Sequence, residues 1–85
     1  MPDIQIYTSP FCGFCSRAKS LLASKGVDFE EIDVTMNPGK RQEMAARAGA
    51  NSVPQIFVDG NHIGDCQKIH DLDATGRLGS LLGIG

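Results

Sequence analysis

The sequence has no apolar run that approaches the roughly 20 residues of a membrane-spanning helix, so no membrane partner is expected. It also lacks any run or stripe of like charge, because its 8 Lys and Arg and 10 Asp and Glu residues are scattered and give a net charge of -2. A basic surface for nucleic acid or for a membrane is therefore not expected. Residues 1–4 carry no positive segment followed by an apolar one, so we expect no secretion signal.

Cysteine is also scarce, since there are three, and an odd number does not form a disulfide framework. Two of them, Cys12 and Cys15, form a C-x-x-C pair. A permanent bridge between them would close too short a loop to stabilise the fold appreciably. In a chain without a secretion signal, such a pair indicates redox or metal chemistry in the cytoplasm.

The length of 85 residues allows one domain, over residues 1–85. Apolar periodicity and turn residues predict the order β-α-β-α-β-β-α, followed by a last helical turn. The expected ranges are strands at 4–8, 29–34, 55–58 and 62–63, helices at 13–24, 38–48 and 66–74, and the last turn around 78–82. Two parallel strands followed by an antiparallel hairpin predict an α/β fold, with a four-stranded mixed sheet and helices on both faces.

Several local signals support these elements. Asn37 before Pro38 predicts a helix start, and Asp65 is expected to cap the third helix. Asp59-Gly60 predicts a tight hairpin turn because both residues tolerate a positive φ, and Gly64 is expected to leave the sheet. The positions expected to face the core are Phe14, Ala18, Leu21, Leu22, Met44, Ala45, Ala48, Cys66, Ile69, Leu72, Leu78, Leu81 and Leu82.

The stretch from Ser9 to Arg17 places the C-x-x-C pair between a strand and a helix. A helix N-terminus favours negative charge, and the thiolate is the form of cysteine that attacks disulfides. A free thiol with a pKa of about 8.5 is only about 3% ionised at pH 7, and the helix dipole contributes only about 0.3–1 kcal/mol. Direct hydrogen bonds to the sulfur are therefore required, with the amides of Phe14 and Cys15 and the Cys15 thiol as the nearest donors. Cations such as Arg17 or Lys19 would add smaller, screened contributions.

The spacing also predicts different roles for the two cysteines. Cys12, at the mouth of the helix, is expected to be exposed and to attack, whereas Cys15, one turn further in, is expected to be buried and to resolve the mixed disulfide. One alternative is an unreactive pair of core cysteines. Another is a zinc site that adds Cys66 and either His62 or His70, although no second C-x-x-C or H-x₃₋₅-H motif accompanies the pair.

Other polar and turn residues carry weaker signals. From the sequence alone the Val53-Pro54 bond is taken as trans, and a cis bond would let the Val53 backbone pair with an extended peptide. Lys40 and Arg41 are expected on a solvated helix face, where they could meet a small acidic ligand. Cys66 is expected to pack at the start of the third helix.

Taken together, these motifs resemble those of the glutaredoxins over nearly the whole chain. The matching segments are Ile6-Tyr7-Thr8, Cys12-Gly13-Phe14-Cys15, Arg17-Ala18-Lys19, Ser52-Val53-Pro54-Gln55-Ile56-Phe57 and Asn61-His62-Ile63-Gly64 leading to Cys66. The resemblance implies a thioredoxin-like fold with a cis Val53-Pro54 bond. It further implies a monomeric thiol–disulfide oxidoreductase with glutathione as co-substrate and no tightly bound cofactor. Its substrates would be protein disulfides and protein–glutathione mixed disulfides.

The resemblance also assigns roles to single residues. Cys12 would be the nucleophile and Cys15 the resolving thiol, with Phe14 flanking the glutathione groove. The Val53-Pro54 segment would pair with the cysteinyl unit of glutathione, and Arg41 would reach its glycine carboxylate. The backbone amides around Cys66 and Gln67 would hold the γ-glutamyl carboxylate at a helix N-terminus.

Three departures from the family pattern matter. Where many members have Gly-Gly-Cys-Asp, this chain has Gly64-Asp65-Cys66-Gln67, so Asp65 would supply the acid that meets the glutathione ammonium. Ser9 stands where many members carry a lysine. Cys-Gly-Phe-Cys is similar to the Cys-Gly-Phe-Ser of monothiol members, which bind a [2Fe–2S] cluster between two protomers with two glutathiones. This leaves a cluster-binding dimer, with Cys12 as a ligand, as an alternative function, although the chain lacks the extra loop residues of those proteins.

Overall fold

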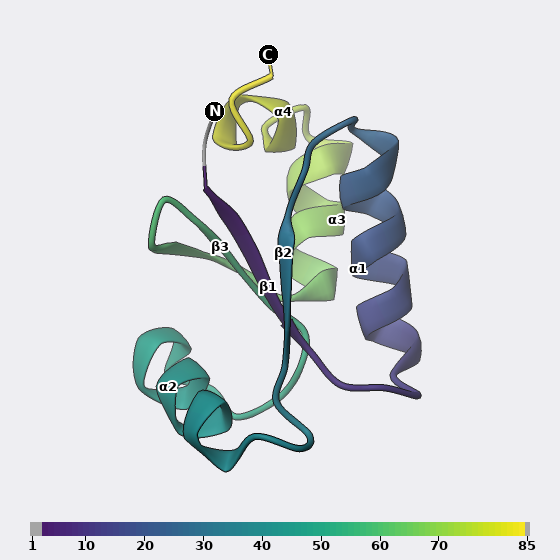
Figure 1. The fold of residues 1–85 in the computed structure, drawn as a ribbon. Helices are drawn as coiled ribbons and strands as arrows, with labels where there is room; N and C mark the ends of the chain where they lie inside the picture. Colours follow the sequence, from purple (N-terminus) through teal and green to yellow (C-terminus); the bar gives the residue numbers. More distant parts are fainter. Residues whose placement is uncertain (1–2, 85) are drawn as a thin grey trace.

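The computed structural model describes residues 3–84 and has the predicted order of elements, including the last helical turn (Figure 1). The elements are β1 (Ile4–Thr8), α1 (Gly13–Ser24), β2 (Glu30–Asp33), α2 (Pro38–Ala48), β3 (Gln55–Val58), β4 (Asn61–Gly64), α3 (Cys66–Ala74) and α4 (Leu78–Leu81). Residues 1 and 2, on which the absence of a secretion signal was partly argued, and residue 85, the end of the expected domain, lie outside the described residues.

The four strands form one mixed sheet in the order β2-β1-β3-β4. β1 is parallel to β2 and antiparallel to β3, and β4 is antiparallel to β3, which confirms the predicted topology. β2 is shorter than predicted, because its ladder with β1 spans only Glu30–Asp33 and leaves Phe29 and Val34 outside. Because β1 and β2 are parallel, their carboxyl ends lie together at one end of the sheet, and α1 begins just beyond the end of β1.

The β3–β4 hairpin shows one confirmed and one wrong prediction. Asp59 and Gly60 form the turn with φ values of 52° and 82°. Gly64 does not leave the sheet, because it is the last residue of β4 and pairs with Ile56 beyond a β-bulge. With its φ of 141°, Gly64 lies so close to Lys68 that a Cβ there would be 2.3 Å from the Lys68 Cγ. Glycine therefore lets α3 start directly against the end of the strand.

The helices cover both faces of the sheet, as predicted. α1, α3 and α4 lie on one face and α2 lies on the other (Figure 1). α2 begins at the predicted cap, where the Asn37 Oδ1 accepts from the Lys40 amide at 3.2 Å. Within residues 3–84, no helix combines the length and the apolar character that crossing a membrane requires.

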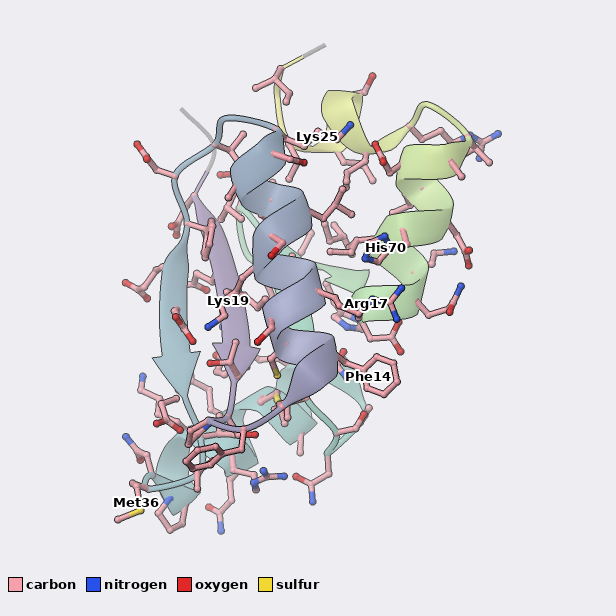
Figure 2. The ribbon with its side chains drawn as sticks, turned by 90° about the vertical axis from the view of Figure 1, so that its right-hand side faces the viewer. Phe14, Arg17, Lys19, Lys25, Met36 and His70 are labelled. Atoms are coloured by element: carbon pink, nitrogen blue, oxygen red, sulfur yellow. The ribbon has the colours of Figure 1, made fainter. Side chains whose placement is uncertain are left out.

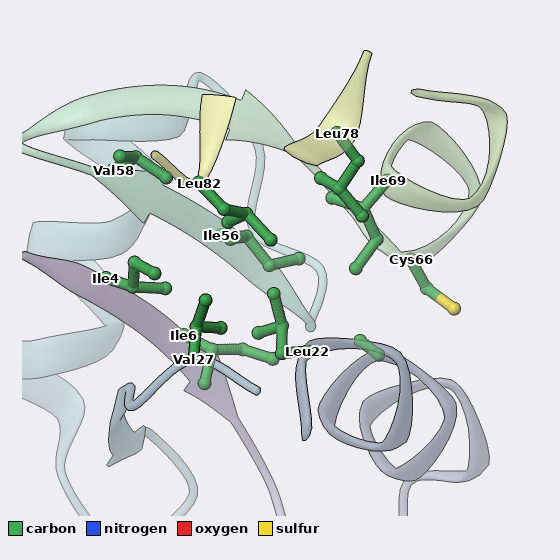
Figure 3. Packing of buried hydrophobic residues seen from close by; sticks show 11 residues of the cluster. Ile4, Ile6, Leu22, Val27, Ile56, Val58, Cys66, Ile69, Leu78 and Leu82 are labelled. Carbon is green, nitrogen blue, oxygen red and sulfur yellow. The ribbon is translucent and has the colours of Figure 1, made fainter. Parts of the chain in front are cut away.

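Two groups of buried residues hold these layers together. The larger one packs the β1 and β3 side chains, including Ile6 and Ile56, against Leu22 of α1, Ile69 of α3 and Leu78 of α4 (Figure 3). The smaller one lies on the opposite face of the sheet and consists of Tyr7, Val34, Met44 and Phe57. Successive β1 residues therefore face different layers, as the pleat of a strand requires.

Some residues predicted to face the core lie elsewhere. Phe14 is 61% exposed, because it lies in the first turn of α1 and points away from β1 and β2 (Figure 2). Ala45 is half-buried and outside both clusters, whereas Ala48 is half-buried but packs against the smaller cluster, as predicted. Leu81 is 42% exposed, whereas Leu78 and Leu82 are buried.

Replacing the fully buried Leu22 by alanine should lower the free energy of unfolding by about 2–5 kcal/mol, because it removes apolar contacts and leaves a cavity between α1 and the sheet. The matched control is Leu81→Ala, which removes the same atoms from an exposed site and should cost about 0.5 kcal/mol or less. Equilibrium urea unfolding measures both values. Equal losses in the two variants would show that the packing described for Leu22 is wrong.

Candidate active site

The sulfur of Cys12 caps the N-terminus of α1. Cys12 has extended backbone angles, with φ -106° and ψ 110°, and its carbonyl accepts the first helical hydrogen bond from the Ser16 amide at 3.1 Å. The Cys15 amide donates to the Cys12 Sγ at 3.2 Å. Of the two amides that the sequence offered as donors, that of Cys15 provides the bond. An amide donor directed at the sulfur stabilises its anionic form more than its neutral form.

The three cysteines are all unbridged, but only Cys12 is partly exposed. Cys15 is 1% exposed and Cys66 is 4% exposed. Burial, with a further contribution from the hydrogen bond to Cys12, raises the pKa of the Cys15 thiol to about 12. Burial also raises the pKa of Cys66, against the opposing effect of the nearby Arg17 guanidinium. Cys12 is thus the thiol that a substrate can reach, and Cys15 is held neutral beneath it.

A groove of about 320 Å³ lies between the start of α1, the loop before β3 and the start of α3. The Val53-Pro54 bond in this loop is cis, as the resemblance implied. The residues that line the groove are Phe14, Ser52, Val53, Pro54, Asp65, Cys66 and Gln67. The fold therefore brings together six of the seven residues expected to contact glutathione, and it adds Ser52, which the sequence reasoning missed although it directly precedes Val53.

The start of α3 gives the groove a polar wall. The Asp65 Oδ1 accepts from the Lys68 amide at 2.9 Å and so caps the helix, while the Asp65 carboxylate stays exposed at the groove. The Gln67 amide group donates to the Asp71 Oδ1 at 3.0 Å, one turn along the helix. Asp65 is therefore the residue that places a negative charge at this wall, next to the free backbone amides of the first helical turn.

Arg41 does not line the groove. Its Nη1 donates to the Asn51 carbonyl oxygen at 2.7 Å and to the Asn51 Oδ1 at 3.3 Å. Because Asn51 directly precedes Ser52 in the loop, Arg41 connects α2 to the segment that carries Val53. Its expected contact with a carboxylate stays a prediction.

Neither histidine joins the cysteine pair. The His62 Nε2 lies 2.7 Å from the Gln55 Oε1, and the ring lies against that of Phe57 with centroids 5.1 Å apart. The His70 Nε2 is buried without a hydrogen-bond partner in the described residues. Over residues 3–84, no group of three or more His, Cys, Asp or Glu side chains is placed to hold a metal ion.

A polar cluster next to Cys15 was missed by the sequence reasoning. Glu31 of β2 accepts from the Thr8 hydroxyl at 2.7 Å and from the Lys19 ammonium at 3.0 Å, both through its Oε2. The Thr8 hydrogen bond and then that of Lys19 hold the pKa of Glu31 below its usual value. The sequence offered one signal for this cluster, because Lys19 lies four residues after Cys15 and so on the same face of α1.

Comparison with known proteins identifies related chains. The sequence model of the glutaredoxin family matches residues 4–63. The chain is 50% identical over 82 residues to glutaredoxin 3 of Escherichia coli K12, an alignment that covers 96% of this chain and 99% of the relative. It is 48% identical to a glutaredoxin from Brucella melitensis, whose solution structure superposes with a TM-score of 0.87 over 100% of this chain and 92% of the other. The crystal structure of a buckwheat glutaredoxin–glutathione complex superposes with a TM-score of 0.86 at 26% identity, covering 96% of this chain and 77% of the other.

The folded protein should be alkylated by iodoacetamide at Cys12 well before Cys15 or Cys66. Because the pKa of Cys15 is raised to about 12, this thiol stays protonated and unreactive from pH 7 to pH 9, and burial protects both Cys15 and Cys66. Peptide mapping by mass spectrometry over time measures the three sites, and the same reaction in urea, where all three should be modified, is the control. Modification of native Cys15 at the rate of Cys12 would contradict the assignment.

Proposed function

Because this chain belongs to the glutaredoxin family, which consists of thiol–disulfide oxidoreductases that use glutathione, we propose that it reduces protein disulfides and protein–glutathione mixed disulfides with glutathione as the electron donor. Cys12 is the nucleophile and Cys15 the resolving thiol in this proposal. The observation that carries it is the capping hydrogen bond from the Cys15 amide to the Cys12 sulfur, because this bond stabilises a partly exposed thiolate two residues before Phe14, which lines the groove.

The polar groups of the groove support glutathione as its ligand. In this proposal the backbone of Val53 pairs with the cysteinyl unit, and Phe14 flanks it. The amides of Cys66 and Gln67, at the start of α3, hold the γ-glutamyl carboxylate as a helix N-terminus does. The Asp65 carboxylate meets the γ-glutamyl ammonium. The buckwheat relative, whose structure contains glutathione, supports this assignment by its overall similarity.

The proposed cycle balances as thiol–disulfide exchange. The Cys12 thiolate attacks one sulfur of a protein disulfide, which forms a mixed disulfide and releases the other sulfur as a thiolate that takes up a proton. Cys15 then loses its proton and attacks the Cys12 sulfur, which forms the Cys12–Cys15 disulfide and releases the second protein thiol. Two glutathiones restore the dithiol and leave as oxidised glutathione. With a glutathionylated protein, Cys12 takes the glutathione directly, and a second glutathione can complete the cycle without Cys15.

The rest of this proposal concerns the role of Arg41, the oligomeric state of the protein and its location in the cell. Arg41 would donate to the glycine carboxylate through N–H groups other than the Nη1 that contacts Asn51. The protein would act as one domain over residues 1–85 and as a monomer in the cytoplasm, with glutathione and the disulfide-containing proteins as its partners.

Cys12→Ser should reduce turnover of a glutathionylated peptide to the uncatalysed rate, because a serine hydroxyl is not ionised at neutral pH. Cys15→Ser should keep most of that turnover, since the monothiol route needs only Cys12, but it should lose most reduction of an intramolecular protein disulfide. The glutathione-coupled assay with both substrates measures these rates, and Lys25→Gln, at the far end of α1 from the cysteines, is the control that should behave as wild type. Equal loss in the Cys12 and Cys15 variants on the glutathionylated peptide would refute the assigned roles.

Cluster binding is the second candidate function, supported by the exposure of the cysteines. Cys12 is the one partly exposed thiol of the three, so a single chain offers one accessible thiolate, whereas a [2Fe–2S] cluster takes four sulfur ligands. A cluster would therefore require two chains and two glutathiones, as in the monothiol members that the Cys-Gly-Phe motif resembles.

Anaerobic reconstitution with iron, sulfide and glutathione tests this second function. If it holds, a brown dimer forms that absorbs visible light, and Cys12→Ser abolishes it while Cys15→Ser does not. Size-exclusion chromatography with absorption detection measures both properties. A colourless monomer from the wild-type protein would exclude cluster binding under these conditions.

A further inference from the structure

One turn along α1 from Cys15, three side chains from three elements form one hydrogen-bonded cluster. The Lys19 ammonium of α1 lies 3.0 Å from the Glu31 Oε2 of β2, and the Thr8 hydroxyl of β1 donates to the same oxygen at 2.7 Å. Thr8 is 1% exposed and so gives Glu31 a fixed anchor at the end of β1. The position of the Lys19 charge is therefore set by the sheet rather than by the flexible lysine side chain alone.

This cluster lies on the side of Cys15. Lys19 is four residues after Cys15, so the two side chains occupy the same face of α1, one turn apart. Figure 2 shows Lys19 on the side of α1 that faces the strands, whereas Arg17 lies on the side toward α3. The Lys19 charge lowers the pKa of Cys15, with a smaller effect than the hydrogen bond with the Ser9 backbone, and the Arg17 charge lowers the pKa of Cys66.

We propose that Lys19, held in place by Glu31 and Thr8, is a positioning residue for the resolving step, in which it stabilises the thiolate of Cys15 while Cys15 attacks the Cys12 sulfur. This inference rests on the proposed function, because it concerns one step of that cycle. It adds a residue that the groove does not contain and that acts on the buried thiol rather than on the nucleophile.

The chemistry of the step explains why such a charge matters. Cys15 must lose its proton to solvent before its sulfur forms the new bond with Cys12, while the bond from Cys12 to the leaving sulfur breaks and that sulfur departs as a thiolate. Burial opposes the ionisation of Cys15. The sulfur of Cys12 adds no charge in this step, because it is part of a neutral mixed disulfide. The groups that act on Cys15 are Cys12 and the Ser9 backbone from the loop and Lys19 from α1. Among them Lys19 is the cation, and it is itself paired with Glu31 of β2.

The test separates the two chemical steps in a single turnover. Reduced protein is mixed with a glutathionylated peptide in the absence of free glutathione, quenched with acid, and analysed by mass spectrometry. The Cys12–glutathione mixed disulfide appears in the first step and decays to the Cys12–Cys15 disulfide in the second. Lys19→Gln should leave the first rate unchanged and slow the second, by about three- to fourfold for each unit by which the pKa of Cys15 rises, since fewer but more nucleophilic thiolates are present. The second rate of Lys19→Gln should also need a higher pH than that of wild type to reach the same value.

Matched variants distinguish charge from structure. Lys19→Arg keeps the charge and should restore the second rate and its pH profile. Lys25→Gln removes another α1 lysine that is paired with an acid, Asp73, at the far end of the helix, and should change neither rate. If Lys19→Gln matches wild type in the second rate and pH profile, or if Lys19→Arg is as slow as Lys19→Gln, the inference is wrong. If wild type forms neither the mixed disulfide nor the Cys12–Cys15 disulfide, the proposed function itself fails.

Discussion

The hydrogen bond from the Cys15 amide to the Cys12 sulfur is the interaction on which the rest of the site depends. It exists because β1 ends at Thr8 and the loop turns directly into α1, so that the first helical turn faces a side-chain acceptor. Cysteine takes here the position that serine, threonine, asparagine or aspartate usually occupies. The same contact that starts the helix therefore also prepares the nucleophile.

The groove beside this contact is assembled from segments that are far apart in the sequence. The cis Val53-Pro54 bond ends the loop before β3, and Asp65 caps α3 just after β4. The antiparallel pairing of β3 with both β1 and β4 brings these two segments beside the start of α1. Arg41 fixes the loop from α2 through Asn51. The sheet register thus brings the Val53-Pro54 loop and the start of α3 to the groove, beside the start of α1.

Local signals explain how much of this was predictable from the sequence. β1, α1, α2, β3 and α3 have the predicted bounds, because strand alternation, helical periodicity and caps such as Asn37 and Asp65 act over a few residues. The resemblance supplied the cis bond and six of the residues that line the groove. The exposure of Phe14, the pairing of Gly64 and the Glu31 contacts were not predicted, because each depends on where another element lies.

A helix that uses a redox-active sulfur as its cap has different stability in its two oxidation states. When Cys12 enters a disulfide, its sulfur becomes a neutral and weaker acceptor, and part of an N-cap interaction of about 1 kcal/mol is lost. Folding therefore favours the reduced form over the oxidised one at this contact. By thermodynamic linkage, this one contact shifts the equilibrium between the Cys12–Cys15 dithiol and its disulfide toward the dithiol in the folded protein, relative to the unfolded chain.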